Sequence, residues 1–229
     1  MSVENAFTAT ARSKARRRPQ RTSYDEASVY AVLDAALMAH VGYLIDGQPF
    51  VTPTAFWREG RQLYWHGAAA SRMLKAVSGA PVCVTISLLD GLVVGRSGFA
   101  HSINYRSVMA FGRARLLTDL AAKRRAMDAF LNRLYPGRTT VLRPASEDEL
   151  KQISVVVMTI EEASAKVREG GPADYAPDEG WGAWLGVLPV EMRMGATVGD
   201  ALTPDLKGLS EGARLDLALT TATSGTGRA

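Results

Sequence analysis

Short runs of β-branched and apolar residues, separated by turn pairs, occupy most of residues 41–117. The runs at 41–45 and 49–57 flank Asp46-Gly47, a pair that accepts positive backbone dihedrals, and therefore predict a β-hairpin. The same pattern predicts further strands at 62–66, 82–89, 92–94, 107–117 and 154–160, with a turn at Asp90-Gly91. We therefore expect a sheet of at least five or six strands.

Other segments repeat their apolar residues with helical spacing. Residues 25–38 show this spacing, and Ser23 and Glu26 near its start have the spacing of a capping box. A long helix is expected from Thr118 or Asp119 to Leu134, and short helices are expected at 71–77 and 147–153. Because these helices are inserted between mostly antiparallel strands, the pattern predicts a mainly β fold, a barrel with peripheral helices.

The two ends of the chain lack this periodicity. Residues 1–22 are polar and basic, and we expect them to form a flexible arm. Residues 23–190 are expected to form the folded domain. Residues 191–229 are rich in Gly, Ala, Thr and Leu and are expected to be a poorly ordered or docking extension.

Composition narrows the class of protein. A content of 47% hydrophobic and 22% charged residues is typical of a packed domain. The net charge of +4 comes largely from the basic arm, where no aromatic residues are interleaved, so nucleic acid is not an expected partner. The apolar run at 82–94 is interrupted by polar residues and is shorter than the roughly 18 residues of a membrane span. With no apolar stretch behind the N-terminal arginines, we expect a cytoplasmic protein.

Sequence motifs for common cofactors and metals are absent. We find no G-x-G-x-x-G after a strand, no G-x-x-x-x-G-K-[ST] and no H-E-x-x-H. His40, His66 and His101 are scattered without a cysteine or carboxylate cluster, so no metal-ion site is predicted, although a single histidine that binds haem remains open. Cys83 lies in an apolar run and is expected to be a small buried hydrophobe.

The segment 64–75 is a candidate phosphate site. A strand ends there in small residues, and a helix start follows with Ser71, Arg72 and Lys75. Helix N-terminal amides together with a hydroxyl and two cations can hold a phosphate. An ordinary loop-to-helix junction with solvated Arg and Lys explains the spacing equally well.

Two later segments also carry side chains suited to a site. Residues 101–107 place a dense set of hydrogen-bonding side chains before an apolar strand. This density indicates either a functional site or an ordinary polar turn or subunit-contact loop. Trp181 and Trp184 lie in a Gly-rich stretch, where an indole can cover a flat ring or fill a core.

These segments, in this order, resemble the pyridoxamine 5'-phosphate oxidase-like FMN-binding family, in the branch that contains Nim-type 5-nitroimidazole reductases. The resemblance covers about residues 18–190, and the run H-S-x-N-Y-R-S-V at 101–108 is its most specific element. The other matching elements are Tyr64-Trp65-His66-Gly67, Ser71-Arg72, Leu89-Asp90-Gly91, Phe111-Gly112, Pro136-Gly137-Arg138, Lys166-Val167-Arg168 and Trp184-x-Gly186-Val187-Leu188-Pro189.

The resemblance implies a split β-barrel that forms a homodimer and binds FMN in clefts shared by both subunits. By this resemblance, residues 66–75 meet the flavin ring and phosphate, residues 102–106 line the cofactor or dimer contact, and Trp184 approaches the partner's flavin. The implied cofactor-binding residues are His66, Gly67, Ser71, Arg72, Lys75, Ser102, Asn104, Tyr105, Arg106 and Trp184. FMN is expected rather than FAD because one phosphate-holding junction is visible and no dinucleotide fingerprint accompanies it.

The leading hypothesis is an FMN-dependent oxidoreductase of the flavin reductase or oxidase type, acting on an unidentified small molecule with a nicotinamide electron donor. Nitroaromatic reduction is one candidate reaction, whereas vitamin B6 oxidation is disfavoured because residues 166–172 and 181–189 lack the Arg-rich substrate segment of authentic pyridoxamine phosphate oxidases. His66 is the catalytic candidate near the reactive face, with a structural histidine as the equal alternative. The alternative function is a non-catalytic flavin- or haem-binding module for sensing, storage or haem handling.

Overall fold

A computed structural model describes residues 5–173 and 175–193 of the chain. Its helices are α1 (Glu26–Asp34), α2 (Arg72–Val77), α3 (Leu120–Leu134) and α4 (Glu147–Gln152), with 3-10 turns η2 (Pro19–Arg21), η3 (Gly98–Ala100), η4 (Arg138–Thr140) and η5 (Ala176–Asp178). The strands are β1 (Thr22–Ser23), β2 (Met38–Ile45), β3 (Gln48–Glu59), β4 (Gln62–Ala68), β5 (Pro81–Val94), β6 (Ser102–Leu116), β7 (Ile153–Thr159), β8 (Glu162–Arg168) and β9 (Gly186–Pro189).

An antiparallel barrel forms the centre of the molecule. Its strands follow the order β6-β7-β4-β3-β2-β5, and the pairing of β5 with β6 closes the ring. Alternate residues of each strand point inward, as in β2, where Ala39, Val41 and Tyr43 are buried. The mainly β, split-barrel fold class predicted from the sequence is confirmed.

Helices cover part of the barrel. Helix α1 begins at Asp25, whose side chain accepts a hydrogen bond from the backbone N–H of Ser28 at 2.7 Å. Helix α3 begins in the same way at Asp119 and packs on the outer side of the sheet, over a cluster that includes Trp57 and Tyr64. Both helix starts lie within a residue or two of the predicted positions.

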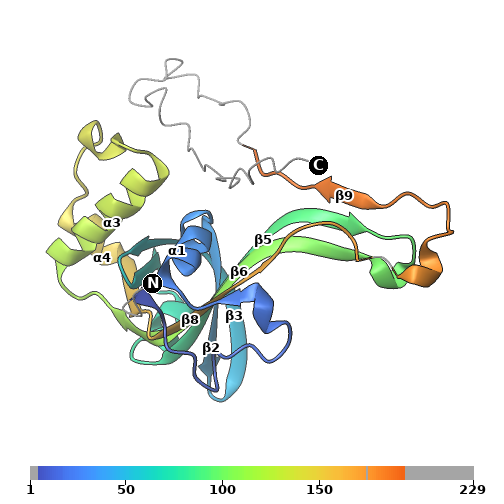
Figure 1. Cartoon of the computed structure of the whole chain (residues 1–229). Coiled ribbons are helices and arrows are strands. Elements are labelled where there is room, and N and C mark those ends of the chain that lie inside the picture. The colour runs from blue at the N-terminus through green and yellow to red at the C-terminus, as the bar shows by residue number, and fades with distance from the viewer. Residues whose placement is uncertain (1–4, 174, 194–229) are drawn as a thin grey trace.

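Strands β5 and β6 continue beyond the barrel as a projecting arm (Figure 1). We define the arm as residues 89–105, 169–173 and 175–193, in which β9 pairs with the outer half of β5. The predicted turn at Asp90-Gly91 is wrong, because β5 passes through these residues with a β-bulge. Gly91 is needed there for close packing, since a Cβ on it would lie 3.0 Å from Val187 Cγ1 on the strand that covers it.

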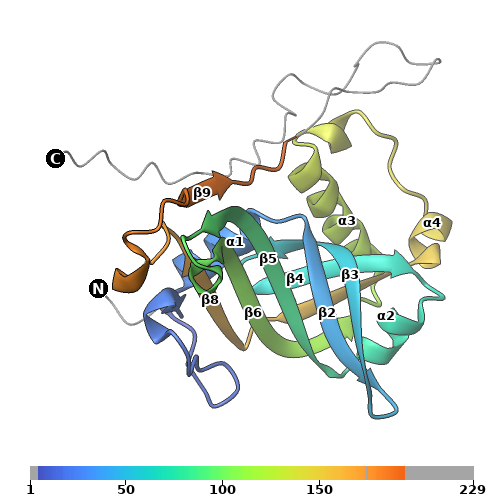
Figure 2. The ribbon, with the colours of Figure 1, turned by 90° about the vertical axis from the view of Figure 1, so that its right-hand side faces the viewer.

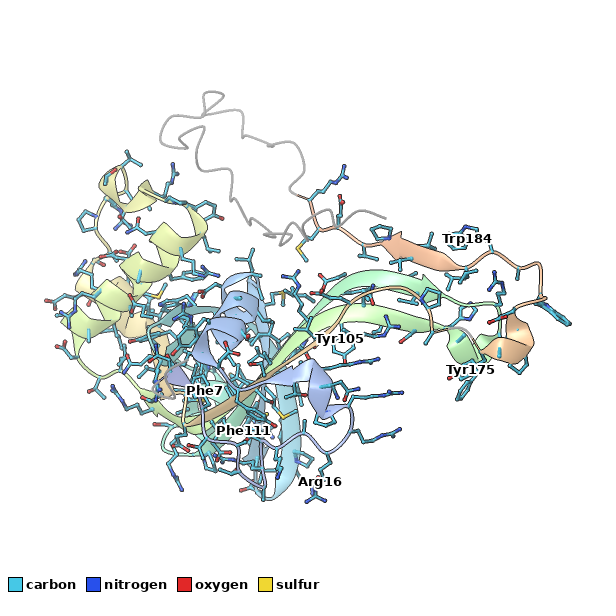
Figure 3. The ribbon with its side chains drawn as sticks, in the orientation of Figure 1. Phe7, Arg16, Tyr105, Phe111, Tyr175 and Trp184 are labelled. Carbon is cyan, nitrogen blue, oxygen red and sulfur yellow. The ribbon has the colours of Figure 1, made fainter. Side chains whose placement is uncertain are left out.

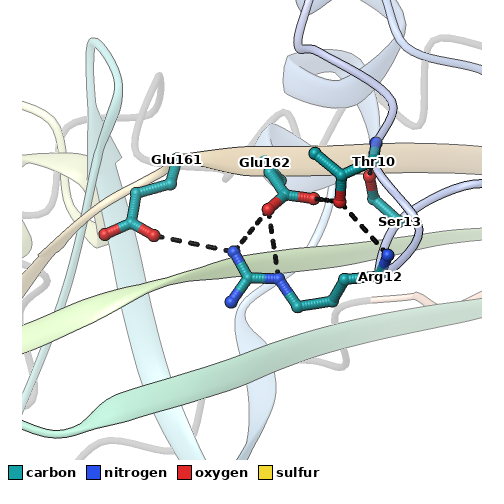
Figure 4. Close-up of polar contacts among 5 residues, drawn as sticks. All are labelled: Thr10, Arg12, Ser13, Glu161 and Glu162. Carbon is teal, nitrogen blue, oxygen red and sulfur yellow. Dashed lines mark hydrogen bonds and ion pairs between the residues drawn. The ribbon is translucent and has the colours of Figure 1, made fainter.

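The N-terminal segment differs from the expected flexible arm, because residues 5–21 lie on the barrel. Phe7 is buried and packs edge-on against Tyr30. Arg12 forms ion pairs with Glu162 at 2.6 Å and Glu161 at 3.6 Å, and the Thr10 hydroxyl donates to Glu162 (Figure 4). The sequence did not predict this packing, because it depends on one aromatic residue, Phe7, and on acidic partners about 150 residues away. Neither feature produces a local periodic pattern.

The predicted C-terminal extension lies outside the described residues from residue 194 onward. Within the described part, no helix combines the length and the apolar character required to cross a membrane. The cytoplasmic location stays a prediction.

Candidate functional site

His66 lies on the outer face of β4, beside helix α3. Its ring packs against Phe130 of α3, with centroids 4.9 Å apart, and against Trp57 of β3, at 6.1 Å. His66 Nδ1 and Trp57 Nε1 are both buried, and neither has a hydrogen-bond partner among the described residues. Buried polar atoms without partners are uncommon in native folds and therefore mark this aromatic cluster as a candidate for ligand contact.

Burial also sets the charge of His66. It lowers the pKa of the imidazole, because the charged form loses hydration in these apolar surroundings. The ring is therefore neutral at pH 7, the form in which histidine binds a metal centre or accepts a proton.

The loop after His66 has the close packing that its small residues suggest. A Cβ on Gly67 would lie 3.2 Å from Leu74 Cδ1 of α2, so this position favours glycine. Ser71 caps α2 by accepting a hydrogen bond from the Leu74 N–H at 3.4 Å. The Arg72 guanidinium lies 4.8 Å from the centre of the Phe50 ring, and both Arg72 and Lys75 are exposed. These two cations are thus accessible, whereas the Ser71 hydroxyl already has a structural partner.

The second predicted cluster lies at the base of the arm, on β6. Asn104 is buried, donates to the carbonyl of Gly170 at 3.1 Å and accepts from Arg168. Arg106 forms a bidentate pair with Asp90 at the β-bulge, at 3.0 and 2.7 Å. Both residues therefore hold the arm to the barrel, while Tyr105 is half-buried and Ser102 is exposed.

Trp184 does not fill a core in this chain. Its side chain is 62% exposed on the arm, next to β9 (Figure 3). The indole lies over Gly186, where an added Cβ would come within 2.7 Å of the ring. An exposed indole that packs against the backbone of Gly186 is suited to cover a second surface.

The structure does not bring all the predicted site residues together in one chain. His66, Gly67, Ser71, Arg72 and Lys75 lie near the start of β5, whereas Trp184 and Ser102 lie near its far end. Strand β5 is 14 residues long, which corresponds to about 45 Å in extended conformation. A single chain therefore presents two separate groups of candidate flavin contacts, near opposite ends of one long strand.

A cavity of about 430 Å³ lies between α3, η4 and α4, and nothing in the sequence patterns predicted it. Its lining is mixed, with apolar Met127, Leu131 and Leu142 beside the Arg143–Glu149 ion pair. The loop that forms one wall, residues 138–146, has no periodicity from which a cavity can be inferred.

Cys83 is half-buried, and burial raises the pKa of its thiol, which disfavours a reactive thiolate.

A family model described as pyridoxamine 5'-phosphate oxidase matches residues 25–167. The chain belongs to this flavin-binding family. The family resemblance stated from the sequence is thereby confirmed.

Two solved structures are similar over most of the chain. The flavocytochrome Anf3 from Azotobacter vinelandii is 41% identical, with a TM-score of 0.82, over 87% of this chain and 94% of that one. The FAD and haem binding protein from Mycobacterium smegmatis is 34% identical, with a TM-score of 0.77, over 83% of this chain and 97% of that one.

More distant structures share the fold. A structure from Bacteroides thetaiotaomicron, named for 5-nitroimidazole antibiotic resistance, is 23% identical with a TM-score of 0.53, over 64% of this chain and 86% of that one. A search of curated proteins found no match.

Proposed function

We propose that this protein is a redox protein of the flavin-binding family that binds haem as well as flavin and passes electrons between a small-molecule donor and an acceptor. The observation that carries the proposal is the 41% identity to a flavocytochrome over 87% of the chain. The second similar structure, named for FAD and haem, points the same way. The 23% identity to the nitroimidazole resistance structure concerns the fold alone, so nitroaromatic reduction stays a prediction.

The chemistry of His66 suits a haem ligand. The imidazole is neutral because burial lowers its pKa, and it lies among aromatic rings with its Nδ1 unpartnered within the described part of the chain. Haem is commonly held by one histidine in an apolar pocket. His66 would bind the iron, and Trp57 and Phe130 would exclude water from that side.

The flavin would be held by the exposed cations Arg72 and Lys75 and covered by Trp184. When bound, a flavin supplies hydride and electron transfer, and a haem supplies one-electron transfer. These side chains would orient the flavin, exclude water from it and place positive charge near its phosphate. The sequence predicts FMN, whereas one similar structure is named for FAD, so FAD is the competing candidate.

We further propose that the protein is a homodimer, for which the structure offers a bare sheet face. The outer faces of β2, β3, β5 and β6 carry no helix (Figure 2). Large apolar side chains are exposed on this face, and their strand registers place them on the same side of the sheet: Met38, Leu44, Val51, Leu89 and Met109. Several large apolar side chains exposed on one face of a sheet favour an interface there. A second chain on this face could bring its Trp184 to the first chain's Arg72.

The test is the identity of the cofactors. The purified protein is denatured, and the released small molecules are identified by mass spectrometry after an absorption spectrum of the native protein. We expect a flavin together with haem b and its Soret band. Release of neither cofactor, from a protein that also fails to take up added flavin and haemin, refutes the proposal. Release of flavin without haem supports instead the flavin-dependent oxidoreductase predicted from the sequence.

A further inference from the structure

Arg168, the last residue of β8, is a buried cation whose hydrogen-bond partners are all uncharged. Its side chain donates to the Asn104 amide oxygen and to the carbonyls of Gly170, at 3.5 Å, and Gly171, at 3.3 Å. Within residues 5–173 and 175–193, no carboxylate forms an ion pair with it. A guanidinium has five N–H donors, so these three contacts leave two donors for another partner. Burying a charge without a counter-charge is costly unless a ligand supplies one.

More positive charge lies beside Arg168. Burial is the main cause that lowers the pKa of Arg168, and the charge of Arg21 in η2 lowers it further. Lys166 precedes Arg168 by two residues, and therefore shares its face of β8. The Lys166 ammonium donates to the Arg17 carbonyl at 3.3 Å. Thr22 pairs with Lys166 across the sheet, and its hydroxyl oxygen is buried without a partner among the described residues.

The N-terminal segment adds to this charge. Residues 5–21 contain no acidic side chain, and Arg16, Arg17 and Arg18 are exposed. Figure 3 shows Arg16 pointing away from the ribbon and Tyr105 at the base of the arm. Tyr105 lies directly opposite Arg168 in the pairing of β6 with β8. Arg168 therefore lies beside one of the predicted flavin-contact residues.

We propose that Arg21, Lys166 and Arg168 form an anion site that binds a phosphate group of a nucleotide. Guanidinium forks and an ammonium group match the several oxygens of a phosphate, and the Thr22 hydroxyl can donate to the same group. Arg168 is 8% exposed, so a single compact anionic group fits better than an extended polymer. The basic segment also lacks the interleaved aromatic residues that stack on nucleic-acid bases.

The nucleotide is either the flavin itself, in which case this site holds the flavin phosphate in place of Arg72 and Lys75, or a nicotinamide dinucleotide that reduces the flavin. The choice between a flavin and a nicotinamide dinucleotide rests on the proposed function. The proposal of an anion site does not depend on that function. Tyr105 connects the site to the candidate flavin contacts, which favours a phosphate of a ligand that reaches the flavin region.

The experiment compares the full-length protein with two variants, Arg21→Gln and Lys166→Gln, whose folding is checked by circular dichroism. Inorganic pyrophosphate binding is measured by calorimetry, and flavin content per chain is measured after denaturation. Arg125→Gln, which removes an exposed cation from α3, is the control. Arg168 is left intact because its contacts with Asn104 and Gly170 also serve the fold.

If a nicotinamide donor uses the site, the parent protein binds pyrophosphate, and each variant binds it about tenfold more weakly with unchanged flavin content. If the flavin phosphate fills the site, the parent protein does not bind pyrophosphate, and the variants are purified with less flavin than Arg125→Gln. Unchanged flavin content together with unchanged pyrophosphate affinity in both variants overturns the anion site. Binding of duplex DNA that depends on these residues and is not displaced by pyrophosphate overturns it as well. A protein without flavin that binds pyrophosphate through Arg21 and Lys166 would refute the proposed function and keep the site.

Discussion

His66 is the residue on which the haem proposal depends. Replacing it with alanine should remove the Soret band, because the iron would lose its protein ligand, while the barrel and its flavin should be kept. His40→Ala is the control, since His40 is exposed on the bare outer face of β2 and is not among the residues proposed to hold the haem. The measurement is the haem content per chain after reconstitution with haemin. Equal haem content in the two variants would assign the iron ligand to another residue.

The lowered pKa of His66 predicts how haem retention depends on pH. A proton competes with iron for the imidazole, so haem can be released only after the pH has fallen below the pKa of the free histidine. Burial moves this pKa downward from its ordinary value, which is about 6.5. The Soret band should therefore persist as the pH falls through 6.5 and disappear only at lower pH. If half of the Soret band is already lost at a pH above 6.5, haem is not held by a histidine in apolar surroundings.

Strand β6 shows how one glycine allows an element to change partners. β6 pairs with β8 up to Phe111 and with β7 from Ala114 onward, and Gly112 lies between the two pairings. A Cβ on Gly112 would lie 2.2 Å from the carbonyl oxygen of Thr159. Gly112→Ala should therefore lower the free energy of unfolding by about 3 kcal/mol, through overpacking against backbone.

Gly98→Ala is the control for this prediction, because no atom lies within 4 Å of a Cβ at that position. Urea unfolding of both variants gives the comparison. A Gly112→Ala variant as stable as Gly98→Ala would mean that β6 and β7 separate more easily than their packing indicates.

The sequence predicted those elements whose pattern is local. The hairpin at Asp46-Gly47 and helices α2 and α3 follow from turn pairs, caps and periodicity, and they lie close to their expected places. Strand β8 was not predicted, because its buried hydrophobic residues are only two alanines, and the strand is defined by its pairing with the N-terminal segment and β6. Strand β9 is four residues long and is defined by its contact with β5. Among the candidate site residues, Asn104 and Arg106 stand out in the local sequence, but their hydrogen-bond partners Arg168 and Asp90 required the tertiary structure.

At the scale of the whole molecule, the separation of the two candidate clusters predicts a flavin site built from two chains. The group at Arg72 and Lys75 and the group at Trp184 lie near opposite ends of β5. A ligand that binds only the dimer also stabilises it, so added flavin should raise the melting temperature and favour the dimer in sedimentation. A monomer that keeps its full complement of flavin at low micromolar concentration would contradict a shared site.

Complementation between two defective chains is the most direct test of this arrangement. One chain carries Arg72→Gln and Lys75→Gln, which removes the cations proposed to hold the phosphate, and the other carries Trp184→Ala, which removes the proposed cover. Each homodimer should bind flavin weakly, because both of its sites lack one component. In a mixed dimer, one site combines both defects and the other receives Arg72 and Lys75 from one chain and Trp184 from its partner. The mixed dimer, isolated with two different affinity tags, should therefore bind about one flavin per dimer with the parent affinity. If each site belonged to one chain, every site in the mixed dimer would keep its own defect, and no tight site would appear.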